Sequence, residues 1–114
     1  MNKGCIIAWM DDMDMGARLA RLSTVYSYTL EFVDDIDGIL KLNDVGVIII
    51  DLNNTSHQNI VALNHIKEKQ DFTLIGFCIE ANGPVINHFK DIGCDMVFKR
   101  IDLIRNLGSI IGKI

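Results

Sequence analysis

The sequence has little of what marks several large classes of protein. Its lysines and arginines form no run, and 11 of them against 15 acidic residues give a net charge of −4, so a nucleic-acid surface has no electrostatic basis. Its apolar runs, such as Val47–Ile50, are far shorter than the ~20 residues that span a bilayer. We therefore expect the protein to bind neither nucleic acid nor membrane.

Motifs for covalent cross-links, metals, nucleotides and export are also missing. Cys5, Cys78 and Cys94 form no C-x-x-C pair, which predicts reduced, buried thiols rather than disulfides or a zinc site. No Walker-type or dinucleotide glycine motif supports nucleotide binding. The amino terminus reaches Asp11 before an export-signal core could be complete, so we expect a cytoplasmic protein.

What the chain does have is enough apolar sequence for one core. It contains 114 residues, 49% of them hydrophobic, with a mean hydropathy of +0.24, and we expect a single domain over residues 1–114. Apolar runs bounded by turn or charge signals predict strands, and segments with apolar residues three or four apart predict helices between them. The expected strands are Cys5–Met10, Tyr28–Val33, Val47–Ile50, Phe72–Ile79 and Cys94–Phe98. The last helix is expected to carry its apolar face on Ile101, Ile104, Leu107, Ile110 or Ile111, and Ile114.

This alternation predicts an α/β fold, a three-layer doubly wound (flavodoxin-like) sheet of five parallel strands in the order 2-1-3-4-5. In such a sheet a crevice lies outside the carboxyl ends of strands one and three. Asp11 and Asp12 end the first strand and Asp51 ends the third, so three carboxylates are expected to meet there.

Two interpretations of these aspartates remain open. Packed carboxylates favour a hard cation such as Mg²⁺. Alternatively, Asp11 and Asp12 cap the first helix and Asp51 begins a loop, because aspartate is common at both places. The basic residue at the end of strand five is equally open, since a one-residue shift decides whether Lys99 or Arg100 faces the site. We favour Lys99, as a point charge for a phosphoryl oxygen.

Over essentially its full length the chain resembles the CheY-like receiver domains of bacterial response regulators. The resemblance lies in Asp11-Asp12, in Asp51 after its apolar strand, and in the segment 93–99 that ends at Lys99. It implies that Asp51 accepts a phosphoryl group from a histidine kinase or phosphotransfer protein and that Asp11 and Asp12 hold Mg²⁺. It also implies that Asn53 adds its backbone carbonyl to the metal and that Lys99 contacts the phosphoryl oxygens.

Several positions depart from the receiver pattern. Cys78 stands where the family carries Ser or Thr, Arg100 replaces a proline, and Met96 or Val97 stands where an aromatic ring is usual. Such gaps are typical of pseudo-receivers, which keep the fold without phosphorylation-dependent switching. Two functions follow: a stand-alone phosphoacceptor receiver in two-component signalling, or a phosphorylation-independent module that binds other proteins.

In the second case we expect the contact face near Ile86, Phe89 and Ile101. In both cases we expect a signalling module rather than an enzyme, present as a monomer or weak dimer. Because we expect no output domain after the last helix, we also expect the module to act through a downstream protein target. A flavodoxin-like FMN carrier is disfavoured, because Asp11, Asp12 and Asp14 would repel the FMN phosphate.

Overall fold

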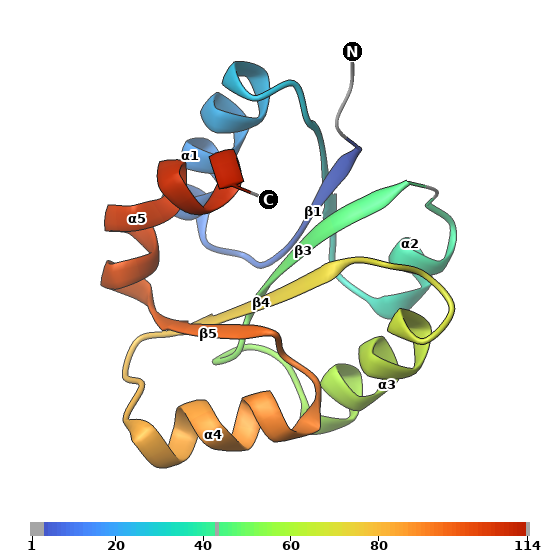
Figure 1. Ribbon diagram of the computed structural model, residues 1–114, viewed down its shortest axis with the longest axis vertical. Coiled ribbons are helices and arrows are strands. Elements are labelled where there is room, and N and C mark those ends of the chain that lie inside the picture. The colour runs from blue at the N-terminus through green and yellow to red at the C-terminus, as the bar shows by residue number, and fades with distance from the viewer. Residues whose placement is uncertain (1–3, 43, 114) are drawn as a thin grey trace.

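Five strands and five helices alternate along the chain. The computed structural model describes residues 4–42 and 44–113. The strands are β1 (Cys5–Trp9), β2 (Thr29–Val33), β3 (Val45–Asp51), β4 (Thr73–Cys78) and β5 (Met96–Lys99). The helices are α1 (Met13–Val25), α2 (Ile36–Leu40), α3 (His57–Lys67), α4 (Gly83–Ile92) and α5 (Arg100–Lys113). All strand pairs are parallel, and the order β2-β1-β3-β4-β5 confirms the predicted fold (Figure 1).

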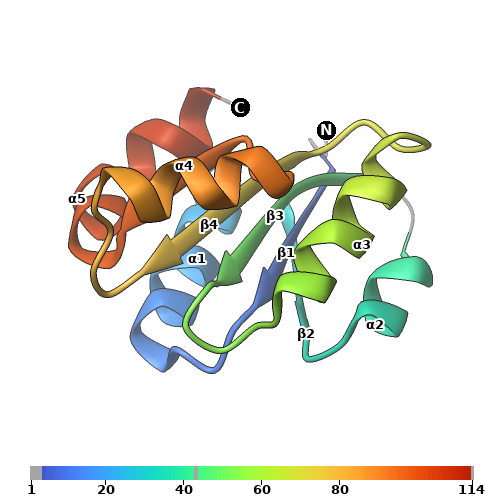
Figure 2. The same cartoon turned by 90° about the horizontal axis from the view of Figure 1, so that it is seen from below.

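Helices cover both faces of the sheet, which explains why the central strands are apolar at successive positions. Figures 1 and 2 show α1 and α5 on one face and α2, α3 and α4 on the other. Along β3, Ile49 packs in one cluster with Met15 of α1 and Leu103 of α5. Its neighbour Ile48 packs in the opposite cluster with Ile60 of α3. The core therefore consists of two apolar layers separated by the sheet.

A glycine inside β4 is explained by the chain that follows β3. A Cβ atom at Gly76 would lie 2.7 Å from Cδ1 of Leu52, whose side chain is buried over this point of the strand. Gly76 thus lets Leu52 pack directly on the β4 backbone, close to the carboxyl end of β3.

Four helices begin with a side-chain cap. In each case a side-chain oxygen accepts a hydrogen bond from the backbone N–H three residues later. The capping residues are Asp12, Asp35, Ser56 and Asn82. The capping interpretation of Asp12 is therefore confirmed, and the cap leaves its carboxylate at the carboxyl edge of the sheet.

The last helix buries a stripe that overlaps the predicted one. Leu107 and Ile111 are buried as expected, and Ile104 and Ile110 pack against the same core cluster. The prediction is wrong at Ile101, which is 49% exposed, and it lacks Leu103, which is fully buried. Residues 1–3, 43 and 114, including the Ile114 assigned to this helix from the sequence, lie outside the described residues. No helix in the described ranges is long and apolar enough to cross a membrane.

Candidate functional site

The carboxylate of Asp12 and the guanidinium of Arg100 are joined by two hydrogen bonds. Arg100 Nε donates to Asp12 Oδ2 at 2.6 Å and Nη2 donates to Oδ1 at 3.1 Å. Nη2 also lies 3.4 Å from Oδ2 of Asp14. The side chain of Asp12 is 16% exposed and that of Arg100 is 32% exposed. The first turn of α5 is thus held against the first turn of α1 by a partly buried, two-point ion pair.

This pair shifts the pKa of both partners. The hydrogen bond from Arg100 lowers the pKa of Asp12 below its usual range, against the opposing effect of burial, and the Met15 N–H adds to the lowering. The same hydrogen bond raises the pKa of Arg100. Packed carboxylates raise one another's pKa unless a cation neutralises them. Here the neutralising cation is a side chain of the protein itself.

The arrangement leaves little room for a metal ion at Asp12. Its carboxylate accepts two hydrogen bonds from Arg100 and one from the Met15 N–H, which uses three of about four acceptor positions. Among residues 4–42 and 44–113, no group of three or more His, Cys, Asp or Glu side chains could hold a metal ion. The carboxylates in this arrangement do not fit Mg²⁺ as ligands, because Arg100 would first have to leave Asp12.

Of the two basic residues at the end of β5, Arg100 faces Asp12, whereas Lys99 was favoured from the sequence. Arg100 reaches the acidic residues, whereas Lys99 is exposed and makes no ion pair with any described residue. Side chains in a helix lean towards its amino terminus, and the amino terminus of α5 lies at the carboxyl edge of the sheet. Arg100, the first residue of α5, is therefore directed to Asp12. Asp11 is likewise exposed, and no partner for it is found in the described part of the chain.

Asp51 ends β3 and is 8% exposed. Its Oδ1 accepts a hydrogen bond from the backbone N–H of Asn53 at 2.9 Å, and its Oδ2 accepts one from Nδ2 of Asn54 at 2.9 Å. Both bonds lie within the turn that follows β3, so the carboxylate stabilises its own loop, as the second sequence interpretation proposed.

Asn53 fastens this loop to the neighbouring strand. Its side-chain Oδ1 accepts a hydrogen bond from the backbone N–H of Ile79, one residue after β4, at 2.9 Å. The backbone N–H of Asn53 is committed to Asp51. The receiver resemblance makes its backbone carbonyl a metal ligand, and this role stays a prediction.

Solved structures with the same arrangement of elements include several response regulators. CheY4 of Vibrio cholerae shares 16% identity, and the match covers 96% of this chain and 99% of that chain with a TM-score of 0.74. The Mn²⁺-bound form of response regulator Rcp1 shares 13% identity over 96% of this chain and 90% of that chain, with a TM-score of 0.65. A structure of the CheA3 P1 domain in complex with CheY6 from R. sphaeroides shares 15% identity over 97% of this chain and 98% of that chain, with a TM-score of 0.70.

The chain has the CheY-like receiver fold. At these identities the likeness concerns the fold, and no protein-family model and no curated protein matches the sequence. Within this receiver fold, Cys78 lies beside Asp51 at the end of β4, since the negative charge of Asp51 adds to burial in raising the pKa of its thiol. The Cys78 Sγ donates to the backbone carbonyl of Glu80 at 3.3 Å, so this weak donor points to its own loop.

The contact face expected from the sequence is less exposed than predicted. Ile86 and Phe89 of α4 are half-buried and pack against the core of the receiver fold, and only Ile101 of the three is exposed. Two histidines, for which the sequence offered no partner, do come together: the ring centroids of His57 and His88 lie 5.5 Å apart.

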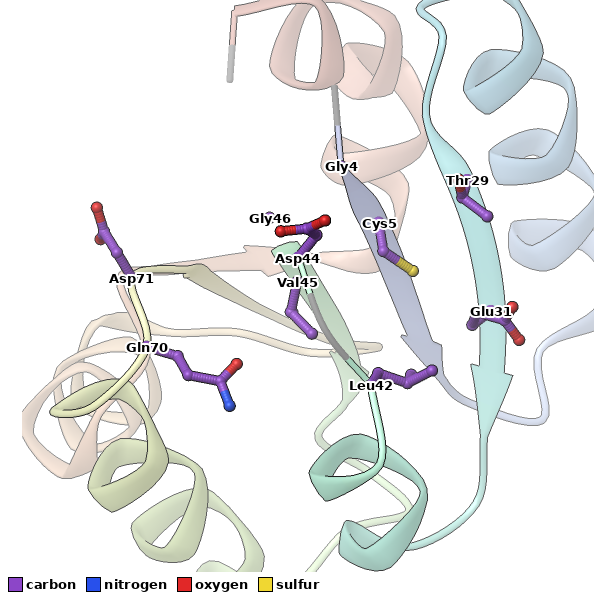
Figure 3. A pocket seen from close by; sticks show the side chains of 10 residues that line it. All are labelled: Gly4, Cys5, Thr29, Glu31, Leu42, Asp44, Val45, Gly46, Gln70 and Asp71. Carbon is purple, nitrogen blue, oxygen red and sulfur yellow. The ribbon is translucent and has the colours of Figure 1, made fainter. Parts of the chain in front are cut away.

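A hollow of about 950 Å³ lies at the opposite edge of the sheet, where β1, β2 and β3 begin. Its carboxylates, on Glu31, Asp44 and Asp71, lie apart from one another around the opening (Figure 3). Sequence patterns contain no signal for it, because its lining comes from four separate segments. With no converging donors, it does not add to the site at the carboxyl edge.

Proposed function

We propose that the protein is a pseudo-receiver: a protein-binding module of two-component-type signalling that works without phosphorylation. The observation that carries this proposal is the ion pair between Arg100 and Asp12. In a phosphoacceptor receiver the acidic residues after β1 hold a divalent cation, which neutralises the charge on the transferred phosphoryl group. In this chain the guanidinium of Arg100 takes that position, and it is covalently fixed at the start of α5.

The environment of Asp51 agrees with this role. Phosphoryl transfer to a carboxylate needs positive charge nearby. Each oxygen of Asp51 accepts one hydrogen bond from the following loop, and Lys99 is exposed and forms no ion pair with a described residue. The hydroxyl that couples phosphorylation to switching in the family is replaced by the thiol of Cys78, a weaker hydrogen-bonding group.

The partners follow from the fold. The structure of CheY6 with the P1 domain of CheA3 supports a histidine kinase or phosphotransfer protein as one binding partner. We propose a downstream protein target as the other. The module works in the cytoplasm as a monomer or weak dimer and turns over no substrate.

A second candidate is the phosphoacceptor receiver that the sequence resembles. Asp51 is the nucleophile in this case, Asp11, Asp12 and the Asn53 carbonyl hold Mg²⁺, and Lys99 contacts the phosphoryl oxygens. The observation in its favour is the burial of Asp51 at the carboxyl end of the central strand. The Mn²⁺-bound Rcp1 structure supports divalent-metal binding by a receiver fold. Here Arg100 must release Asp12 before the metal enters.

Incubation with acetyl phosphate and Mg²⁺, followed by intact mass, separates the two candidates. The pseudo-receiver proposal expects no phosphoryl adduct on the wild-type chain. An adduct that is present on the wild type and lost in Asp51→Asn would overturn it in favour of the second candidate.

The variant Arg100→Ala tests the cause. If it gains an adduct that the wild type lacks, the Arg100 side chain is what prevents phosphorylation of Asp51. If neither protein reacts, the surroundings of Asp51, including Cys78, prevent phosphorylation even without Arg100, and the pseudo-receiver proposal still holds.

A further inference from the structure

An open groove of about 440 Å³ runs along α1 on the side that faces β2. Arg18 and Arg21 of the same helix line a separate groove next to α5. The lining consists of Met10, Asp11, Asp12, Met13, Gly16, Ala17, Ala20 and Phe32. Its floor is therefore made almost entirely of apolar or small side chains.

The groove exists because α1 carries small residues at helical spacing opposite an aromatic ring. Ala20 lies four positions after Gly16 and three after Ala17, so both share a helix face with it. A Cβ atom at Gly16 would lie 3.1 Å from Cε1 of Phe32, so the ring packs directly on the α1 backbone. Any larger side chain at these positions would fill the space.

Two large apolar side chains at this groove are left in water. Met13 is 89% exposed and Phe32 is 56% exposed. Exposed apolar residues are common when scattered singly, but a contiguous apolar groove with a polar rim marks an interaction site. β2 is also the edge strand of the sheet, so neither helix nor strand covers the outer side of Phe32.

The rim of the groove is acidic. A smaller adjoining hollow shares Met10 and Asp11 with it and adds Asp34 to the lining. Among the described residues, Asp11 and Asp34 form no ion pair, while Asp12 is neutralised by Arg100. Among residues 4–42 and 44–113, no lysine, arginine or histidine lines either hollow. An occupant must therefore supply the positive charge.

We propose that this groove binds a basic, amphipathic segment of another protein. An apolar side chain of that segment lies between Ala17, Ala20 and Phe32, and lysines or arginines on either side of it pair with Asp11 and Asp34. The exposed rim pairs speed association and select the partner, and the apolar contact supplies most of the affinity. The inference deepens the proposed function by giving the module a binding surface away from Asp51.

Peptide binding to the full chain tests the proposal. The probe is a short amphipathic peptide of lysine and leucine, followed by the amide chemical shifts of the ¹⁵N-labelled protein. Shifts are expected at Asp11, Ala17, Ala20 and Phe32, and the affinity should fall as salt is added. The matching peptide of glutamate and leucine, and one of lysine and serine, should bind far more weakly.

Variants locate the contact. Phe32→Ser should weaken binding roughly tenfold, and Leu40→Ser is its matched control, because Leu40 is 57% exposed on α2 outside the groove. Asp11→Asn with Asp34→Asn should weaken binding roughly fivefold. Should Phe32→Ser disturb the fold, Ala20→Lys, a substitution on an exposed helix position, fills the groove and repels the peptide without touching the core.

Several outcomes would overturn the inference: no shifts at the groove, equal binding of the acidic peptide, or full affinity in Ala20→Lys. Shifts confined to the region of Ile101 would place the surface at the start of α5 instead. The result is independent of the acetyl phosphate experiment. Phosphorylation of Asp51 would remove the pseudo-receiver proposal while leaving this groove untouched, and loss of the groove would leave the Arg100–Asp12 argument intact.

Discussion

Replacing Arg100 by methionine is expected to lower the free energy of unfolding by about 1–2 kcal/mol at neutral pH. Methionine keeps much of the aliphatic length of arginine, so the change removes mainly the two hydrogen bonds to Asp12. A hydrogen bond to a charged group is worth about 1.5–3 kcal/mol when buried, and an exposed ion pair about 0.2–1 kcal/mol. With Arg100 32% exposed, the pair lies between these limits.

A double-mutant cycle with Asp12→Asn isolates the pair. Asparagine is as good an N-cap as aspartate, so it can still accept the hydrogen bond from the Met15 N–H while losing the charge. Asp12→Ala loses cap and charge together and should cost about 1 kcal/mol more. The coupling between Arg100→Met and Asp12→Asn is expected to be about 1 kcal/mol, measured by urea unfolding followed through Trp9, which is 7% exposed in the fold.

Acid should remove this contribution. The pKa of Asp12 is lowered in the folded chain, so the pair stabilises the fold above the ordinary aspartate pKa of about 3.9. Its contribution is lost as the pH falls from that value through the lower folded-state pKa. Wild type and Arg100→Met should therefore converge in stability on acidification. Equal stability at neutral pH, or a difference that acid leaves unchanged, would refute the assignment of Arg100 as the neutralising group.

Three further variants or reagents test caps and packing elsewhere in the fold. Gly93→Ala is expected to destabilise the chain by about 1–3 kcal/mol, since φ is +142° there and a Cβ would lie 2.8 Å from that of Asn64; thermal unfolding measures it, and an unchanged midpoint would contradict the strain. Asn82→Ala should cost about 1 kcal/mol by leaving the N–H of Val85 without its cap, whereas Asn82→Asp should restore nearly all of it in the same denaturant assay. Burial raises the pKa of Cys94 to about 12, so a thiol reagent at pH 8 should modify Cys94 only at the rate of unfolding; rapid labelling in the absence of denaturant would contradict its burial.

Most of the fold could be predicted from local patterns, because both faces of the sheet are covered. Strands such as Val45–Asp51 then contain few polar residues, and the segments between them show helical spacing. The cap at Asp12 could be predicted for the same local reason, since the side chain and the N–H that it accepts from are three residues apart.

What sequence patterns could not predict depends on contacts between distant segments. The choice between Lys99 and Arg100 depends on where β5 ends and α5 begins, and that junction has no intervening loop. On α5 the buried Leu107 and Ile111 were predicted, but Ile101 was assigned to the inner face in place of Leu103, because only packing against the sheet separates these neighbouring positions. The α1 groove was also invisible, since Phe32 meets Gly16 only after β2 has paired with β1.

The Arg100–Asp12 contact also has a consequence for the order of folding. The two residues are 88 positions apart, and the guanidinium can reach the carboxylate only after β5 has joined the sheet and α5 has started. Closing so long a segment costs conformational entropy, and the contacts of the sheet must offset this cost before the pair can form. We therefore expect Arg100→Met to leave the refolding rate nearly unchanged and to speed unfolding. The pair would then form after the folding transition state and stabilise a sheet that is already complete.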